Sequence, residues 1–375
     1  MLCRSILVAL ALIAIPCSIG LAQEAKSERR VVLITLDGLR GEEVFNGADQ
    51  RLIVKENGVD DVEATTARFW RETAEERRQT LLPFLWETCS GERGWLAGNI
   101  ELDSVVAVTN GLYFSYPGYN EILCGFPDPK VNSNAKKLNE NVTVLEWLNQ
   151  QPAFAGQVAA YGSWDVFPFI INDKRSGIPV NAGWMPLKVG NPERIEALNY
   201  VAKNLFHEWD GVRYDSITAS GAIEEMKTNK PRVLFVALGE TDDWAHKGRY
   251  DRYLLTAQQN DGFIRDLYQT AQSIPEYKDN TLFIVACDHG RGDGREGWKN
   301  HSVLLAGSER IWLAAFGADL AVTGVDHGGK YEQAQVAATV AAYLGLDFSH
   351  HNPKIRPSLP VVDLAKDPHS PSPKK

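Results

Sequence analysis

Carboxylate and imidazole side chains recur just beyond apolar stretches of this sequence. Six residues have such a setting: Asp37, Asp242, His246, Asp288, His289 and His301. Carboxylate oxygens and imidazole nitrogens are ligands for Zn²⁺ and for similar divalent cations. Six ligands and one hydroxyl group are sufficient for two cations that each keep room for a substrate. The sequence therefore predicts a two-metal centre, with Zn²⁺ expected because of the histidines and Mn²⁺ as the alternative.

The spacing within two of the pairs bears on how they bind. Asp242 and His246 are four positions apart, so they meet on one face of a helical turn. Asp288 and His289 are adjacent, and on an extended strand their side chains would diverge. A turn at the end of the strand, or ligation to two different metals, removes that difficulty.

Two alternatives to these ligands remain open. Asp243 stands beside Asp242 and is a rival carboxylate, although the four-residue spacing to the histidine favours Asp242. His327, in the stretch GVDHGGKY, is a rival to His301, and there it follows Asp326 directly. Taken one at a time, such residues are more often turn, surface or capping residues, and it is their combination at strand ends that indicates a metal centre.

The elements that position these residues alternate along the chain. Apolar stretches typical of buried strands are 31–36, 104–108, 156–161, 232–238, 281–286 and 310–316. Helical patterns lie between and after them, at 195–205, 251–272 and 332–346. Fully apolar strands that alternate with helices predict an α/β fold, a three-layer αβα sandwich around a mostly parallel sheet. Ligands bind such sheets beyond the carboxyl ends of the strands, where the six residues stand.

Composition limits the class of function. The chain has 375 residues, 44% of them hydrophobic, and carries a formal net charge of −9. This composition is that of an ordinary folded protein, and the acidic balance argues against general binding to duplex nucleic acid. An anionic substrate is compatible with it, because bound cations invert the local field. We predict one catalytic domain over residues 23–365.

Both ends of the chain differ from this domain. Residues 1–22 contain an apolar run ending in Gly20-Leu21-Ala22, which is typical of a signal peptide cleaved after Ala22. A membrane anchor is the alternative, but the run is short and Pro16 interrupts it. We therefore expect a periplasmic or secreted protein without stable membrane insertion, and a disordered tail at 366–375. The mature chain keeps three cysteines, which allow at most one disulfide: Cys89, Cys124 and Cys287.

Four motifs and a late histidine, taken in chain order, resemble the alkaline phosphatase superfamily, in the branch of the nucleotide pyrophosphatase/phosphodiesterases. The motifs are ITLDGLR, FSYPGYNEILCG, GETDDWAH and ACDHG, followed by His301. The resemblance implies an alkaline phosphatase-like fold with a small cap from inserted loops. It also implies that one metal is held by Asp37, Asp288 and His289, and the other by Asp242, His246 and His301. Ser115, which starts the predicted helix in the second motif, would contact the metals and be transiently phosphorylated.

The activity implied by this resemblance is hydrolysis of small-molecule phosphate esters, diesters or monoesters, through a phosphoseryl intermediate. Asn120 is expected to bind the substrate, two positions after the place where the phosphodiesterases have an Asn. Trp164 and Phe167 are expected to form an apolar wall for the second alcohol of a diester, although core packing is an equal alternative. Lys174 and Arg175 are further candidates for contact with the substrate.

Three other functions remain as alternatives. Sulfatases of the same superfamily need a modified Cys or Ser before x-Pro-x-Arg, whereas here Ser115 is followed by Tyr-Pro-Gly-Tyr and no arginine. Phosphoethanolamine transferases share the SxPGxxxxxxG pattern, but they usually carry transmembrane helices. A binding protein that kept the fold and lost catalysis would have replaced Ser115 or the ligands, which this chain retains.

Overall fold

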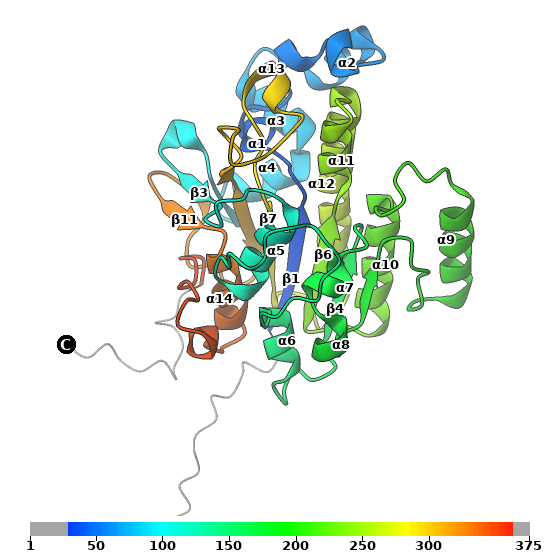
Figure 1. Ribbon diagram of the computed structural model, residues 1–375, viewed down its shortest axis with the longest axis vertical. Coiled ribbons are helices and arrows are strands. Elements are labelled where there is room, and N and C mark those ends of the chain that lie inside the picture. The colour runs from blue at the N-terminus through cyan, green and yellow to red at the C-terminus, as the bar shows by residue number, and fades with distance from the viewer. Residues whose placement is uncertain (1–28, 363–375) are drawn as a thin grey trace, which may run out of the picture.

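A large mixed sheet forms the centre of the computed structural model, which describes residues 29–362 (Figure 1). Its strands, in spatial order, are β10 (Gly324–Val325), β2 (Gly94–Ala97), β9 (Leu313–Gly317), β7 (Thr281–Ala286), β1 (Arg30–Leu36), β6 (Val233–Leu238), β4 (Val158–Gly162) and β5 (Val180–Ala182). The predicted signal peptide (1–22) and tail (366–375) lie outside the described residues.

The middle of the sheet is parallel and fully buried. β1 pairs in parallel with β6 on one side and with β7 on the other. All six residues of 31–36 are buried, which is why this strand is apolar at every position rather than at alternate ones. On the other side of β7, β9 pairs antiparallel with both β7 and β2. The prediction of a mostly parallel sheet is confirmed.

Helices cover both faces of the sheet. One set packs together in front of the sheet in Figure 1: α5 (Ser115–Cys124), α6 (Val144–Asn149), α7 (Phe167–Ile170) and α14 (Gln335–Tyr343). A second set packs around the long helix α12 behind it: α3 (Ala74–Leu81), α4 (Pro83–Cys89), α10 (Asp215–Thr228), α11 (Glu240–His246) and α12 (Tyr250–Ser273). The shorter helices are α1 (Gly41–Asn46), α2 (Val62–Phe69), α8 (Asp173–Ser176) and α13 (Gly294–Gly297). The three-layer αβα architecture is therefore confirmed.

Two predicted strands differ from the expected arrangement. The stretch 104–108 forms β3 (Val105–Ala107), which belongs to a separate small sheet with β11 (Lys330–Glu332) and β8 (Arg310–Ile311). The stretch 310–316 is divided between β8 and β9. Trp312 lies at the division, fully buried, and its indole nitrogen donates to the carbonyl of Leu39. One apolar run thus passes from the small sheet to the large one.

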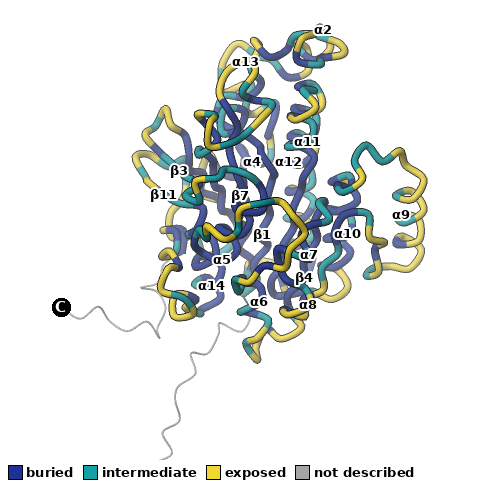
Figure 2. The backbone as a smooth tube through the Cα atoms, viewed as in Figure 1, coloured by how far each residue is buried: buried dark blue, intermediate teal, exposed yellow. Residues whose placement is uncertain are grey.

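The predicted helix over 195–205 is present as α9 (Pro192–Asn204), but most of it is not covered (Figures 1 and 2). Ile195 is its only buried residue, whereas Val201 is 47% exposed. Leu198 is partly buried against the core, whereas Leu205 is exposed like Val201. The segment between β5 and α10 that carries α9 stands at the side of the molecule (Figure 1).

Two further expectations are addressed by the described residues. Within residues 29–362, no helix has the length and apolar character that a membrane crossing requires. Cys89, Cys124 and Cys287 are all buried and all free, so the one disulfide that the sequence allowed is not formed.

Candidate metal centre

The strand register brings the sequence-predicted ligands to one edge of the sheet. Leu36 at the end of β1 pairs with Leu238 at the end of β6, and Thr35 pairs with Ala286 at the end of β7. Asp37 follows the first of these ends, α11 with Asp242 and His246 follows the second, and Asp288 and His289 follow the third. This is the carboxyl edge, where open α/β sheets bind their ligands.

Four side chains form what we term the carboxylate-rich group: Asp37, Ser115, Asp288 and His289. The potential ligand atoms of the first three side chains surround the Nε2 atom of the fourth, His289. Asp37 Oδ1 is 3.2 Å from this nitrogen, Asp288 Oδ2 is 3.5 Å from it and Ser115 Oγ is 3.4 Å from it. The two carboxylate oxygens are buried and have no hydrogen-bond partner. Buried oxygens of this kind need a proton or a cation, so the group is suited to a metal ion.

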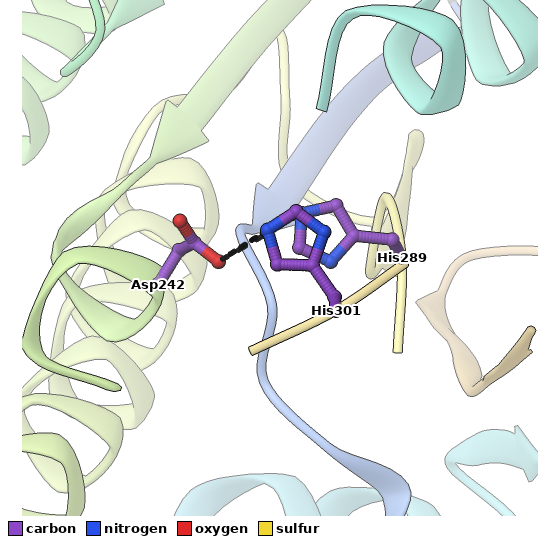
Figure 3. Close-up of side chains that lie close together, drawn as sticks. All are labelled: Asp242, His289 and His301. Carbon is purple, nitrogen blue, oxygen red and sulfur yellow. Dashed lines mark ion pairs between the residues drawn. The ribbon is translucent and has the colours of Figure 1, made fainter. Parts of the chain in front are cut away.

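Three side chains form the histidine-rich group: Asp242, His246 and His301. His246 Nε2 lies 3.1 Å from Asp242 Oδ2 and 3.0 Å from His301 Nε2. His301 also lies against His289, with parallel rings whose centroids are 3.7 Å apart, and Asp242 faces both rings (Figure 3). The two groups are therefore in direct contact.

The spacing of these atoms agrees with metal coordination. A tetrahedral ion with ligands at about 2.0–2.1 Å places its ligand atoms about 3.3 Å from one another. Distances from 3.0 to 3.5 Å occur in both groups. Two sets of three side chains bring their ligand atoms within 4.8 Å of one another, namely Asp242 with His289 and His301, and Asp37 with Asp288 and His289. His289 is common to both sets, so it lies between the two candidate metal positions.

In His289 and His301, the contact made by Nδ1 determines that Nε2 is the nitrogen free to bind a metal. His289 Nδ1 is 2.9 Å from the carbonyl oxygen of Gly290, and His301 Nδ1 is 2.7 Å from that of Tyr113. A carbonyl oxygen only accepts, so each Nδ1 carries the hydrogen and each Nε2 presents its lone pair to the cluster. Tyr113 has a φ of 55°, a left-handed conformation at the residue whose carbonyl meets His301. Ligating histidines typically have such an orienting partner.

The carboxylate-rich group is electrostatically unfavourable without a cation. Burial, and then the charge of Asp242, raise the pKa of Asp37 well above its usual value. Burial, and then the charge of Asp37, raise the pKa of Asp288 in the same direction. Both shifts come from bringing several carboxylates together out of water, which a divalent cation would offset.

The histidine-rich group differs because a cation, the guanidinium of Arg291, lies beside it. Burial alone would raise the pKa of Asp242, but the guanidinium of Arg291 and the two neighbouring histidines hold it well below its usual value. Burial, and then the neighbouring His289, lower the pKa of His301 to about 2. Arg291 donates through Nη1 to Asp242 Oδ1. This arginine was not predicted as a site residue, although it stands two residues after His289.

Helix α5 delivers Ser115 to the cluster from the front layer. Ser115 is its first residue and is buried, and the helix macrodipole favours negative charge at this end. The N–H of Tyr116 donates to Asn134 Oδ1, and Pro117 has no N–H, so these two residues offer no amide to a phosphoryl group. Tyr119, also missed, lies one turn after Ser115 and donates its hydroxyl to Asp37 Oδ2 over 3.1 Å.

The side chains expected to touch substrate are not brought to the cluster. The amide of Asn120 is fully buried, where it donates to the carbonyl of Phe126 and accepts from Asn139 and Asn141. Phe167 is buried in the core between Tyr119 and Phe235. Asn120 and Phe167 therefore have structural contacts, and core packing is the better interpretation of Phe167.

Two further candidates for contact with substrate have other partners. Trp164 is half-buried, packs edge-on against Phe167 and forms a backbone bridge to Val212. Arg175 forms an ion pair with Glu146, one of several contacts that its guanidinium makes. None of the contacts described for these two side chains involves a residue of the cluster.

The structure distinguishes the rival ligands. His301 reaches the cluster, whereas His327 is exposed and Asp326 beside it accepts from Ser104 and Tyr331. Asp243 is close enough to the site for burial, and then the charge of Asp242, to raise its pKa to about 8. Neither Asp243 nor His246 is a member of the two sets of converging ligand atoms, but His246 Nε2 lies 3.1 Å from Asp242 Oδ2 and 3.0 Å from His301 Nε2. The spacing argument for Asp242 and the choice of His301 agree with this geometry.

Comparison with known proteins bears on the fold. No protein family model matches the sequence, and no curated protein matches it either. Solved structures do match. Wild-type alkaline phosphatase PafA is 11% identical, with 86% of this chain and 96% of that chain covered and a TM-score of 0.52. The C-terminal periplasmic domain of EptC from Escherichia coli, in complex with zinc, is 10% identical, with coverages of 92% and 89% and a TM-score of 0.51.

A third structure, Ps i-CgsB, is 15% identical, with 91% of this chain and 77% of that chain covered and a TM-score of 0.52. At such identities the likeness concerns the fold alone. The resemblance to the alkaline phosphatase superfamily is confirmed at that level.

Proposed function

We propose that this chain, which has the alkaline phosphatase fold, is a two-metal hydrolase that cleaves phosphate esters through a phosphorylated Ser115. The observation that carries the proposal is the position of Ser115 Oγ, 3.4 Å from His289 Nε2, a nitrogen that also lies within 3.5 Å of two buried carboxylate oxygens that lack a partner. A serine that only capped a helix would not need this setting.

The carboxylate-rich group (Asp37, Ser115, Asp288 and His289) would hold one cation, and the histidine-rich group (Asp242, His246 and His301) the other. When bound, the two cations would lower the pKa of the attacking hydroxyl and stabilise charge on the attacking and leaving oxygens. Zn²⁺ fits this donor set of carboxylates and imidazoles, and Mn²⁺ is the alternative.

The proposed reaction consists of two displacements at phosphorus, the first by Ser115 and the second by water. Ser115 Oγ attacks phosphorus in line with the leaving alcohol, and a phosphoserine forms as the bond from phosphorus to that alcohol breaks. The proton that Ser115 loses is balanced by the one that the leaving alkoxide gains. Water attacks the phosphorus in the second step, and Ser115 Oγ leaves with its proton restored. The macrodipole of α5 favours the negative phosphoryl group in both states.

The class of ester that is cleaved is argued from the residues that follow Ser115 and from the candidates for substrate contact. Phosphate is favoured over sulfate because no arginine follows Ser115 in the x-Pro-x-Arg pattern of sulfatases. The expectation of a diester depended on an apolar wall of Trp164 and Phe167, and Phe167 is buried in the core. We therefore propose a phosphate ester hydrolase, with the ratio of diester to monoester turnover as the quantity to be measured.

The experiment is a metal analysis combined with three assays. The purified chain should contain about two zinc or manganese ions and should hydrolyse p-nitrophenyl phosphate or bis-p-nitrophenyl phosphate. Ser115→Ala should abolish turnover while metal remains bound, whereas Ser176→Ala, a buried serine on α8, should leave turnover unchanged. Absence of bound metal would contradict the proposal. Turnover of p-nitrophenyl sulfate alone would replace it by a sulfuric ester hydrolase.

We further propose that the protein acts outside the cytoplasm, because its first 22 residues have the pattern of a cleaved leader. Expression in a host that exports proteins, followed by mass spectrometry of the chain recovered outside the cytoplasm, tests this. The expected chain begins at Gln23. Recovery of the full-length chain from the cytoplasm only would contradict the proposal.

A further inference from the structure

Arg291 is a fully buried cation that touches both the strand-end loop and the candidate metal ligands. Its guanidinium uses all three nitrogens. Nε donates to the carbonyl of Trp298 over 2.6 Å, Nη2 donates to that of Lys299 over 2.6 Å, and Nη1 donates to Asp242 Oδ1. A single planar group therefore joins α11 to the segment that leads to His301.

The space for this contact depends on Gly38, the residue after Asp37. A Cβ atom at Gly38 would lie 2.6 Å from Arg291 Nη1 and 2.8 Å from Asp242 Oδ1. Gly38 also has a φ of 60° and donates its N–H to Asp288 Oδ1. The backbone of the first motif thus closes over the Arg291–Asp242 pair on one side and supports the carboxylate-rich group on the other.

The two carboxylate oxygens of Asp242 have different contacts. Oδ1 accepts from Arg291, and Oδ2 lies 3.1 Å from His246 Nε2. Oδ1 also lies 3.6 Å from His301 Nε2, so Oδ2 is the oxygen of Asp242 that has no hydrogen bond to Arg291. The same guanidinium holds the carbonyls of Trp298 and Lys299, which stand just before His301. Two of the three ligands of that group are thus held by one side chain.

We propose that Arg291 is a positioning residue for the histidine-rich group: it presents Asp242 as a one-oxygen ligand and fixes the segment that carries His301. The inference rests on the two-metal centre of the proposed function. It concerns how the centre is assembled, since Arg291 has no exposed surface with which to meet a substrate.

A purely structural ion pair is the alternative, and the chain offers one for comparison. Arg175 donates to both carboxylate oxygens of the buried Glu146, so neither oxygen is left without a partner. Arg291 instead donates to one oxygen of Asp242, Oδ1, and leaves Oδ2 beside His246. Loss of either arginine leaves a buried carboxylate without its cation and is expected to destabilise the fold. Only loss of Arg291 should change metal binding.

The test is a zinc titration of the metal-free protein against a competing chromophoric chelator, which resolves two binding steps. His246→Gln first identifies the step that belongs to the histidine-rich group. In Arg291→Gln this step should weaken 10- to 100-fold, the range found when an orienting partner of a ligand is removed. The other step should change less than about threefold. Arg175→Gln is the matched control and should alter neither step.

Arg291→Lys provides a second variant in case the glutamine variant does not fold. It retains the charge but cannot span Asp242 and two carbonyls, so the same step should weaken. Unchanged or tighter binding in that step, or equal weakening of both steps, would overturn the inference. If the unmodified protein binds no metal, the proposed function fails as well, whereas two tight sites in the unmodified protein and in both variants would defeat the inference alone.

Discussion

Gly118 packs against the carbonyl of Asp288 so closely that a Cβ atom would lie 2.3 Å from that oxygen. This contact sets the distance between helix α5 and the end of β7, and hence the distance between Ser115 and the carboxylate-rich group. It also explains why glycine stands three residues after Ser115, the proposed nucleophile, at the position where the phosphodiesterases have an asparagine. No side chain fits there.

Replacement of Gly118 by alanine should push α5 away from β7. Overpacking of this kind typically costs about 1–3 kcal/mol of stability. We expect a much larger effect on phosphoryl transfer, on the order of 100-fold, because a displacement of about 1 Å removes the alignment of nucleophile and metal. Turnover and the unfolding midpoint should be measured together. Gly91→Ala, where a Cβ would meet no atom within 4 Å, is the control and should change neither.

The late ligand can be tested by exchanging the two rival histidines separately. His301→Gln should reduce bound zinc from about two ions per chain to about one, because it removes a ligand of the histidine-rich group. His327→Gln should leave the zinc content unchanged, since His327 is exposed and lies outside the cluster. Metal analysis of the two variants after identical dialysis is sufficient. Loss of zinc in His327→Gln alone would show that the geometry described above is not the one that binds metal.

Most of the centre could be predicted from sequence because of how parallel strands end. Asp37, Asp242 and Asp288 follow three adjacent strands, and their meeting at one edge is a consequence of sheet topology. The choice between His301 and His327 was not accessible in the same way. It depends on the path of the loop after β7, which the contacts of Arg291 and the carbonyl of Tyr113 determine.

The substrate contacts could not be predicted because periodicity does not say which side of a helix meets a site. Asn120 follows Tyr119 by one residue, a rotation of about 100° around an α-helix. Tyr119 therefore faces Asp37, whereas Asn120 faces the buried amides of Asn139 and Asn141. In the same way, an apolar run did not reveal that Trp312 divides it between two sheets.

The carboxyl groups of Asp243 and Glu240 should make the metal-free protein less stable as the pH rises from about 4.5 to about 8. Burial first, and neighbouring carboxylates second, raise the pKa of Asp243 and of Glu240 to about 8, from 3.8 and 4.5. Such groups stabilise the folded state below their unfolded pKa, and this contribution is lost as the pH rises through the folded pKa. The shifts of Asp37 and Asp288 have the same direction.

His301 acts in the opposite direction at lower pH. Its pKa falls from 6.5 to about 2 on folding, so it stabilises the protein above pH 6.5 and loses that contribution below. The window between about pH 6.5 and 8 therefore isolates the carboxyl groups. Urea unfolding in EDTA should give a decreasing free energy across this window, and Asp243→Asn should reduce the slope. A free energy that rises across the window would contradict the assignment.

Tyr119 should influence metal binding without touching metal or substrate. Its buried hydroxyl donates to Asp37 Oδ2, which leaves Oδ1 as the unpartnered oxygen beside His289. Tyr119→Phe should weaken zinc binding in the carboxylate-rich group about 10-fold, because the carboxylate loses the bond that orients it. Tyr277→Phe is a matched control, since that buried hydroxyl donates to the carbonyl of Pro231. Both variants should lose about 1 kcal/mol of stability, the usual value of such a hydrogen bond. Only the first should change the zinc titration, and equal titrations for the two variants would show that Asp37 is oriented by other contacts.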